Sequence, residues 1–296
     1  MTYLDAGRGH GRRGARLTAY RSLLTAYSSA VSHRARKRFG QHFLTNPRIL
    51  SRIVEALHPL PGQSVLEIGP GKGALTSALV ASGASVTAIE VDRDLAPLVR
   101  EKFPMVRVVE GDALGLDWHD VMGREPFLLT GNIPYNITSP LLDKALLPPR
   151  PERIVFLVQK EVADRITASP GSSDYGALTV GIQTVATAER LFKVPAGAFN
   201  PPPRVDSAVV RLAPRTTRLI GDHEVAEFRR FVTGLFGFRR KQLVRGLREL
   251  THWPADRVSA VIARLSAEPT ARPEVLEPAQ FVALFRELVD EGWTRH

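Results

Sequence analysis

The sequence of 296 residues contains no cysteine and only three methionines and three tryptophans. Without cysteine the chain cannot form disulfides, zinc-thiolate sites or a cysteine nucleophile, and this composition fits a reducing compartment. No apolar run reaches the roughly 18 residues that a membrane-spanning helix needs. We therefore expect a soluble, cytoplasmic protein without a membrane partner, and we place no metal ligands in it.

Acidic residues are scarce relative to basic ones. The chain has 30 Asp and Glu against 40 Lys and Arg, which gives a formal charge of +10 at pH 7 and a pI near 10.3. Such a charge favours a polyanionic partner, and nucleic acid is the commonest one for a soluble protein. The alternative is a basic protein with a solvated surface and no such partner.

Three regions differ in composition. Residues 1–37 are rich in Arg, Gly and Ser with a single acid, Asp5, which predicts a disordered basic arm. A transit peptide, or a translation start further along the chain, are the alternatives for this segment. Residues 38–213 alternate β-rich apolar runs with helical patterns, which predicts an α/β domain with a mostly parallel, Rossmann-like sheet. Residues 214–296 show only helical patterns and predict a smaller all-α domain.

The pattern places five strands and two helices at definite positions. We expect strands over Ser64–Ile68, Ser85–Glu90, Val106–Glu110, Phe127–Thr130 and Arg153–Val158. We expect helices over Glu224–Leu235 and Lys241–Leu250.

A glycine-rich run, Glu67 to Gly73, follows the first predicted strand and precedes a helix. Gly69 and Gly71 let the backbone turn sharply and approach a ligand closely, which is typical of a nucleoside-binding loop. Glu90 ends the next strand, where it can accept hydrogen bonds from a ribose diol. Asp112 follows the third strand and can accept from an adenine amine. The carboxyl ends of neighbouring strands are where open α/β sheets bind ligands. Helix capping is the alternative role for Glu67 and Asp112.

The segment Asn132-Ile133-Pro134-Tyr135 follows the fourth predicted strand. The Asn132 side-chain oxygen and the Ile133 carbonyl can accept the two hydrogens of an exocyclic amine and make its nitrogen more nucleophilic. Pro134 restricts the backbone around it, and the Tyr135 ring can stack on a flat base. A dinucleotide site would not predict this second pocket. The alternative is an ordinary proline turn that ends a buried strand.

Seven ordered motifs between residues 36 and about 250 resemble the family of ribosomal RNA adenine N6,N6-dimethyltransferases, which use S-adenosylmethionine. They are Arg38 to Leu44, Leu66 to Gly73, Gly111 to Ala113, Gly131 to Asn136, Gln159 to Ala163, Tyr175-Gly176 and Phe199 to Ser207. Within that family the last two resemble the 16S small-subunit enzymes more than the 23S antibiotic-resistance methylases.

The resemblance implies roles for matching positions. The cofactor would be bound by Gln41, His42, Leu44, Gly69, Gly71, Glu90, Asp112 and Asn132. The acceptor pocket would consist of Asn132, Ile133, Pro134, Tyr135 and Phe199, with the two aromatic rings on opposite faces of the target adenine. A core aromatic that anchors the proline-rich crossover is the alternative for Phe199.

A dense basic segment in the helical region is interleaved with phenylalanines. Helical spacing predicts that Leu235, Phe236 and Phe238 face inward and the cations outward, toward RNA phosphates. The candidate RNA contacts are Arg229, Arg230, Arg239, Arg240, Lys241 and Arg245. A merely solvated charged face is the alternative.

The resemblance thus implies an enzyme that dimethylates two adjacent adenines of 16S ribosomal RNA in an immature small subunit, acting as a monomer. Two other functions remain open. One is a 23S adenine methylase that confers antibiotic resistance, and the other is a non-catalytic RNA-binding assembly or transcription factor on the same fold.

Overall fold

The structure is a computed structural model of the chain that describes residues 41–265, 268 and 270–294. The predicted basic arm at 1–37 therefore lies outside the described residues. The described chain forms two compact units, which are described separately below. The first contains residues 41–136, 155–157 and 194–205, and the second contains 137–154, 158–193 and 206–294. The predicted boundary at 213/214 stays a prediction.

The central element of the chain is a seven-stranded sheet with strand order β4-β3-β2-β5-β6-β9-β7. Strand β2 pairs in parallel with β3 and with β5, and β3 pairs in parallel with β4. The register aligns Ile68 of β2 with Ile89 of β3 and with Gly131 of β5. The strands are β2 (Ser64–Ile68), β3 (Ser85–Glu90), β4 (Arg107–Glu110), β5 (Leu128–Asn132), β6 (Arg153–Gln159), β7 (Ala186–Val194) and β9 (Ser207–Pro214).

The sequence of β2 explains its central place. Four of its five residues are buried, Val65 to Ile68, as expected for a parallel strand that is covered on both faces. The predicted α/β sheet is confirmed, and the predicted ends of β2 and β3 are correct to the residue.

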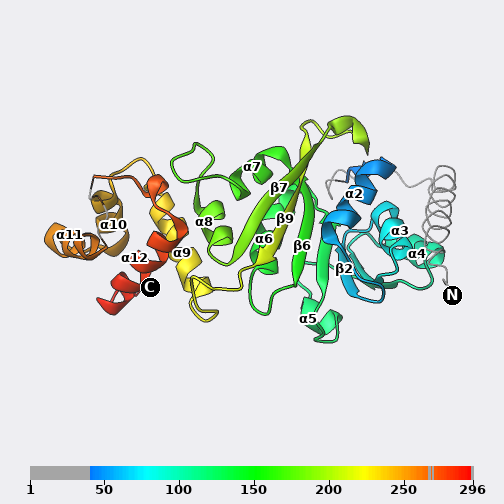
Figure 1. Cartoon of the computed structure of the whole chain (residues 1–296), viewed down its shortest axis with the longest axis horizontal. Helices are drawn as coiled ribbons and strands as arrows, with labels where there is room; N and C mark the ends of the chain where they lie inside the picture. The colour runs from blue at the N-terminus through cyan, green and yellow to red at the C-terminus, as the bar shows by residue number, and fades with distance from the viewer. Residues whose placement is uncertain (1–40, 266–267, 269, 295–296) are drawn as a thin grey trace, which may run out of the picture. The chain divides into compact units, whose positions relative to one another are not determined.

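Within its described residues, the first unit contains four α-helices, of which the first precedes β2 and the others each connect two successive strands (Figure 1). They are α2 (Pro47–Leu57), α3 (Ala74–Ala81), α4 (Leu95–Lys102) and α5 (Trp118–Val121). Helix α2 begins at Pro47, and the Asn46 side chain caps it by accepting from the backbone N–H groups of Arg48 and Ile49. Such a cap satisfies donors that a helix start leaves unpaired. A two-stranded antiparallel sheet joins β1 (Phe43–Leu44) to β8 (Phe199–Asn200). The unit also contains the short helices η2 (Tyr135–Ile137) and η3 (Ala196–Ala198), except that Ile137, the last residue of η2, belongs to the second unit.

The second unit ends in four helices that Figure 1 shows gathered together from yellow to red. An aromatic cluster joins the first of these helices to the last and to the segment after it: the Phe231 ring lies 5.7 Å from the rings of both Phe285 and Trp293. Predicted helices at 224–235 and 241–250 are observed as α9 and α10, shifted by one or two residues. The helices of this unit are α6 (Thr138–Ala145), α7 (Lys160–Ile166), α8 (Ala177–Gln183), α9 (Val225–Phe236), α10 (Leu243–Thr251), α11 (Ala255–Arg264), η4 (Pro273–Val275) and α12 (Pro278–Asp290).

Candidate active site and RNA-binding surface

The glycine loop between β2 and α3 has the backbone that the sequence predicts. Gly69, Gly71 and Gly73 all have positive φ, at 67°, 56° and 78°, a region that other residues rarely adopt. A Cβ at Gly71 would lie 3.0 Å from the Phe43 ring, and one at Gly73 would lie 2.5 Å from the Phe103 ring. The loop therefore needs glycine for its conformation and for the close approach of these aromatic side chains.

Glu90 lies directly beside this loop, at the carboxyl end of β3. Its carboxyl group is buried, and it accepts hydrogen bonds from the backbone N–H of Gly71 at 3.0 Å and of Asp92 at 2.9 Å. Burial raises the pKa of Glu90, while these two hydrogen bonds oppose the rise. Two backbone donors thus fix an acidic acceptor at the position where the sequence predicts a ribose contact.

Glu67 has a different environment from Glu90. Its carboxyl group is buried and accepts a hydrogen bond from the Thr76 hydroxyl at 2.7 Å. Burial, more than any other cause, raises the pKa of Glu67 to about 8, so the group is largely protonated at neutral pH. Because Thr76 lies in the first turn of α3, this bond ties the strand to the following helix, and a capping role for Glu67 stays a prediction. Asp112 is exposed, and its carboxylate accepts from the Leu114 N–H at 2.9 Å.

The acceptor segment begins at the end of β5. Ile133 is buried, and its N–H donates to the Leu157 carbonyl at 3.1 Å. The Asn132 side-chain nitrogen Nδ2 donates to the backbone carbonyl of His42 at 2.7 Å. A carbonyl oxygen only accepts, so Nδ2 must face His42, and Oδ1 remains the atom that can accept from an incoming amine. The orientation of the Asn132 amide is therefore fixed by its partner.

Gly131, which precedes Asn132, explains how closely this segment approaches the glycine loop. A Cβ at Gly131 would lie 2.5 Å from the carbonyl oxygen of Ile68, its neighbour on β2. Only glycine allows the two strand ends to pack at this distance, which brings the start of the acceptor segment next to the start of the glycine loop.

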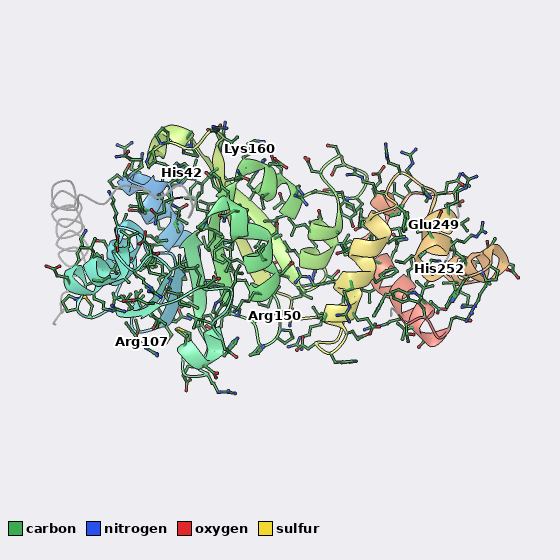
Figure 2. All side chains as sticks on the ribbon, turned by 180° about the vertical axis from the view of Figure 1, so that it is seen from behind. His42, Arg107, Arg150, Lys160, Glu249 and His252 are labelled. Carbon is green, nitrogen blue, oxygen red and sulfur yellow. The ribbon has the colours of Figure 1, made fainter. Side chains whose placement is uncertain are left out.

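The segment around β1 joins the two halves of the candidate site. The Gln41 side chain donates to Asp92 Oδ2 at 2.9 Å, next to Glu90. The His42 ring stacks on Tyr135 with centroids 5.7 Å apart, and its Nδ1 donates to the Pro201 carbonyl at 2.9 Å. Figure 2 labels His42 on this blue segment. The contacts of Asp92 and of the Pro201 carbonyl were missed from the sequence. For Asp92 the only local signal is an acid two residues beyond Glu90.

Phe199 lies in β8, where it pairs with Leu44 of β1. Its side chain is only 4% exposed. In this structure the ring therefore packs inside the first unit, as its alternative role as a core aromatic predicted. A stacking role for Phe199 stays a prediction.

The six candidate RNA contacts fall into two kinds of environment. Arg229 is only 16% exposed, and its guanidinium pairs with the Asp143 carboxylate and donates to the Asp143 carbonyl at 3.0 Å. Burial lowers the pKa of Arg229, and Asp143 opposes that effect. This arginine packs against α8, since a Cβ on Gly181 would lie 3.3 Å from its Nε. The geometry thus gives Arg229 a structural role.

The other five candidate contacts, Arg230, Arg239, Arg240, Lys241 and Arg245, are exposed. Arg239 pairs with Glu274 at 3.1 Å, and Lys241 pairs with Glu249 at 2.8 Å. Leu235 is buried, whereas Phe236 and Phe238 are half-buried. The predicted separation of apolar and basic faces is therefore present around α9 and α10. Across the described residues, no helix is long and apolar enough to cross a bilayer.

The fold and the site define a class of protein. A glycine loop with obligatory positive φ, a buried acidic acceptor at the end of the next strand and an oriented asparagine at the end of β5 fit the site of a Rossmann-like methyltransferase that uses S-adenosylmethionine. Glu90 supplies an acidic acceptor beside the glycine loop, as binding of a nucleoside diol requires.

Comparisons with known proteins identify the family within this class. The family model for ribosomal RNA adenine dimethylases matches residues 32–289. The chain therefore belongs to the ribosomal RNA adenine dimethylase family, and the predicted enzyme class and cofactor are confirmed.

Curated relatives match over most of their length. The chain is 43% identical over 262 residues to the ribosomal RNA small subunit methyltransferase A of Acinetobacter baylyi, covering 87% of this chain and 93% of that protein. It is 44% identical over 268 residues to the protein of the same name from Synechococcus sp. strain JA-3-3Ab, covering 86% and 94%.

Solved structures show the same likeness. A dimethyladenosine transferase from Plasmodium falciparum superposes with a TM-score of 0.75 at 28% identity, covering 85% of this chain and 99% of that one. The 23S rRNA methyltransferase ErmE superposes with a TM-score of 0.64 at 32% identity, covering 83% and 99%.

Proposed function

We propose that the chain transfers methyl groups from S-adenosylmethionine to the N6 amines of two adjacent adenines in small-subunit ribosomal RNA. The observation that carries the proposal is the fixed amide of Asn132, whose Nδ2 is bound by the His42 carbonyl. The names of the two curated relatives support the small subunit as the substrate. We also propose that the enzyme acts as a monomer on immature subunits in the cytoplasm.

The residues of the acceptor segment make the adenine amine reactive. Bound S-adenosylmethionine supplies an electrophilic methyl group. The amine is a poor nucleophile because its lone pair is delocalised into the ring. Asn132 Oδ1 and the Ile133 carbonyl accept the amine hydrogens and favour a tetrahedral nitrogen, so the lone pair becomes available along the line of displacement. The methylated nitrogen then loses a proton to water, and no charged base is needed.

The target base must leave its stack to reach this segment. Tyr135 offers one ring face, and base stacking of this kind contributes roughly 1–3 kcal/mol. In the structure the His42 ring covers part of Tyr135 and Phe199 is buried. We therefore propose that the base displaces the His42 ring as it enters, and that Phe199 reaches the second face of the base only after this movement.

RNA affinity is proposed to come from the second unit. Five basic side chains are exposed there and would contact phosphates, which provide affinity without sequence information: Arg230, Arg239, Arg240, Lys241 and Arg245. Arg229 is left out of this set because its side chain is largely covered and its guanidinium is paired with Asp143.

The likeness to ErmE favours a second candidate function, methylation of 23S ribosomal RNA. The relatives named for the small subunit match at higher identity, 43% and 44% against 32%, which supports the 16S substrate. A binding-only factor is disfavoured by the intact geometry at Glu90 and Asn132.

Replacing Asn132 by Ala tests the proposed chemistry. The variant loses the amine acceptor but introduces no clash or charge, so methyl transfer should fall at least a hundredfold, as removal of one oriented polar group typically does. Cofactor affinity, measured by calorimetry, should stay within about threefold because the glycine loop and Glu90, which bind most of the cofactor in this proposal, are unchanged. Transfer at the parent rate would remove Asn132 from the mechanism.

A further inference from the structure

The second unit contains a hollow of about 890 Å³ whose lining is strongly basic. Five Lys or Arg side chains line it against a single acid, Glu249. The lining consists of Arg240, Lys241, Gln242, Arg245, Arg248, Glu249, His252, Trp253 and Arg272. Figure 2 labels Glu249 and His252 in this part of the molecule.

Much of the charge in this hollow is not neutralised by the protein. Lys241 pairs with Glu249 at 2.8 Å, and Arg272 lies 4.0 Å from Glu274. Within the described part of the chain, Arg240, Arg245 and Arg248 have no acidic partner within 4.0 Å. Nearby arginines outside the hollow do have such partners, as Arg264 does with two acids on α12 and the following turn. The hollow therefore concentrates positive charge that an anion can neutralise.

The pKa of Glu249 is lowered, as expected for the single acid among the basic side chains of this hollow. The hydrogen bond from Lys241 is the main cause that lowers the pKa of Glu249, and Arg248 and His252 lower it further. The first turn of α10 also borders the hollow through Gln242 and Arg245. The amino-terminal end of a helix adds to the attraction for an anion at that point.

An aromatic wall adjoins the cations. Trp253 lines the basic hollow and also a neighbouring hollow of about 620 Å³, which Phe238 and Trp293 border as well. Its indole is half-buried, and the Arg257 guanidinium lies 3.7 Å from the ring centroid. Cations together with a partly exposed aromatic ring are the combination that binds single-stranded nucleic acid.

We propose that this hollow binds one or two nucleotides of single-stranded RNA, with phosphates on Arg240, Arg245 and Arg248 and a base against Trp253. The proposal rests on the proposed RNA substrate but not on the chemistry at Asn132. It adds Arg248 and Trp253 to the predicted RNA contacts, and it makes the surface selective for unpaired nucleotides. The site would hold a segment of the substrate other than the adenine that is methylated.

Tryptophan fluorescence reports on this site directly. Of the three tryptophans, Trp118 and Trp293 are 3% and 4% exposed, whereas Trp253 is half-buried. Titration of the full-length protein with a five-nucleotide single-stranded oligoribonucleotide at low salt should quench the emission, and Trp253→Phe should remove that quenching. In Trp253→Ala, binding is measured with a labelled oligonucleotide, and its affinity should fall by about five- to 150-fold.

Charge variants test the phosphate contacts. The double variant R245A and R248A should lower the slope of log affinity against log salt by about 1.4, since each single-strand phosphate contact contributes about 0.7. The matched control R211A and R218A also removes two solvent-accessible cations, but Arg211 pairs with Glu189, Arg218 pairs with Asp222, and neither lines this hollow. Its salt slope should equal that of the parent protein.

Three results would overturn the proposal. The first is that the oligonucleotide does not quench the emission. The second is that an RNA duplex of the same length binds equally well. The third is that millimolar inorganic phosphate alone displaces the oligonucleotide completely, because the hollow would then be an anion site without base contact. Methyl transfer to small-subunit particles is measured on the same variants at saturating substrate. If transfer persists while oligonucleotide binding is absent, this inference fails and the proposed function stands. If the parent protein shows no transfer but binds the oligonucleotide, the proposed function fails instead.

Discussion

Replacing Asn132 by Asp separates two roles of this side chain that replacement by Ala removes together. The aspartate oxygen can still accept from an adenine amine. It cannot donate to the His42 carbonyl, which in the parent protein lies 2.7 Å from Asn132 Nδ2. Two acceptors would then face each other at this distance. If orientation by His42 matters, Asn132→Asp must impair the enzyme although the new residue is of nearly the same shape.

The size of the effect follows from the burial of the pair. An unsatisfied buried acceptor costs about 1–3 kcal/mol, and because Asn132 is half-buried we take the lower part of that range, about 1–2 kcal/mol. This corresponds to a loss of about five- to 30-fold in kcat/KM. Repulsion would also push β1 away and disturb the contact of Gln41 with Asp92 beside Glu90. Cofactor affinity should therefore fall in Asn132→Asp, whereas it should hold in Asn132→Ala.

Steady-state methyl transfer and calorimetric titration with S-adenosylhomocysteine measure both effects, with thermal unfolding as the check on folding. Asn132→Asp with parent kcat/KM and parent cofactor affinity would refute the argument that the His42 carbonyl orients the amide. A loss of transfer without any loss of cofactor affinity would keep the acceptor role but reject the coupling through β1.

Three further predictions concern stability and the basic surface. Gly73→Ala should lower the free energy of unfolding by about 1–3 kcal/mol, because φ is +78° and the Phe103 ring would lie 2.5 Å from the new Cβ. The control Gly197→Ala should have little effect, because no atom lies within 4 Å of its new Cβ. Urea unfolding measures both variants. The folded-state pKa of Glu67, about 8, lies above its unfolded value of 4.5. Its contribution to the free energy of unfolding is therefore complete below pH 4.5 and is lost as the pH rises through 8. Glu67→Gln should flatten this decline when the free energy of unfolding is measured from about pH 5 to 9. Arg229→Ala should destabilise the fold by about 1–3 kcal/mol with little change in RNA affinity. Arg240→Ala should weaken RNA binding with little change in stability. If both variants lost RNA affinity equally at constant stability, the structural role of Arg229 would be rejected.

Much of the first unit could be predicted because its signals are local. Strands β2 and β3 are short apolar runs bounded by turn residues, and the glycine loop and the Asn132 segment follow strands directly. The ends of β4, β5 and β6 differ from prediction by one or two residues. Strand β7 was not predicted, because its sequence, ATAERLFKV, mixes charged and apolar residues as a helix surface also does.

The contacts that complete the site depend on long-range packing. The pairing of β1 with β8 joins segments more than 150 residues apart, from Phe43 to Asn200, and two-residue strands carry no periodic signal. The burial of Phe199 and of Arg229 could not be known for the same reason, since each depends on which distant element covers it. Residue type indicated the chemistry at these positions, and the tertiary structure decided which side chains are accessible to perform it.

The most direct test of the proposed function uses labelled S-adenosylmethionine with small-subunit particles and, separately, large-subunit RNA from cells that lack this methylation. After transfer, the RNA is digested to nucleosides. We predict labelled N6,N6-dimethyladenosine in the small-subunit sample alone, at two adjacent positions. Label confined to 23S RNA, or cofactor binding without transfer to either substrate, would contradict the account.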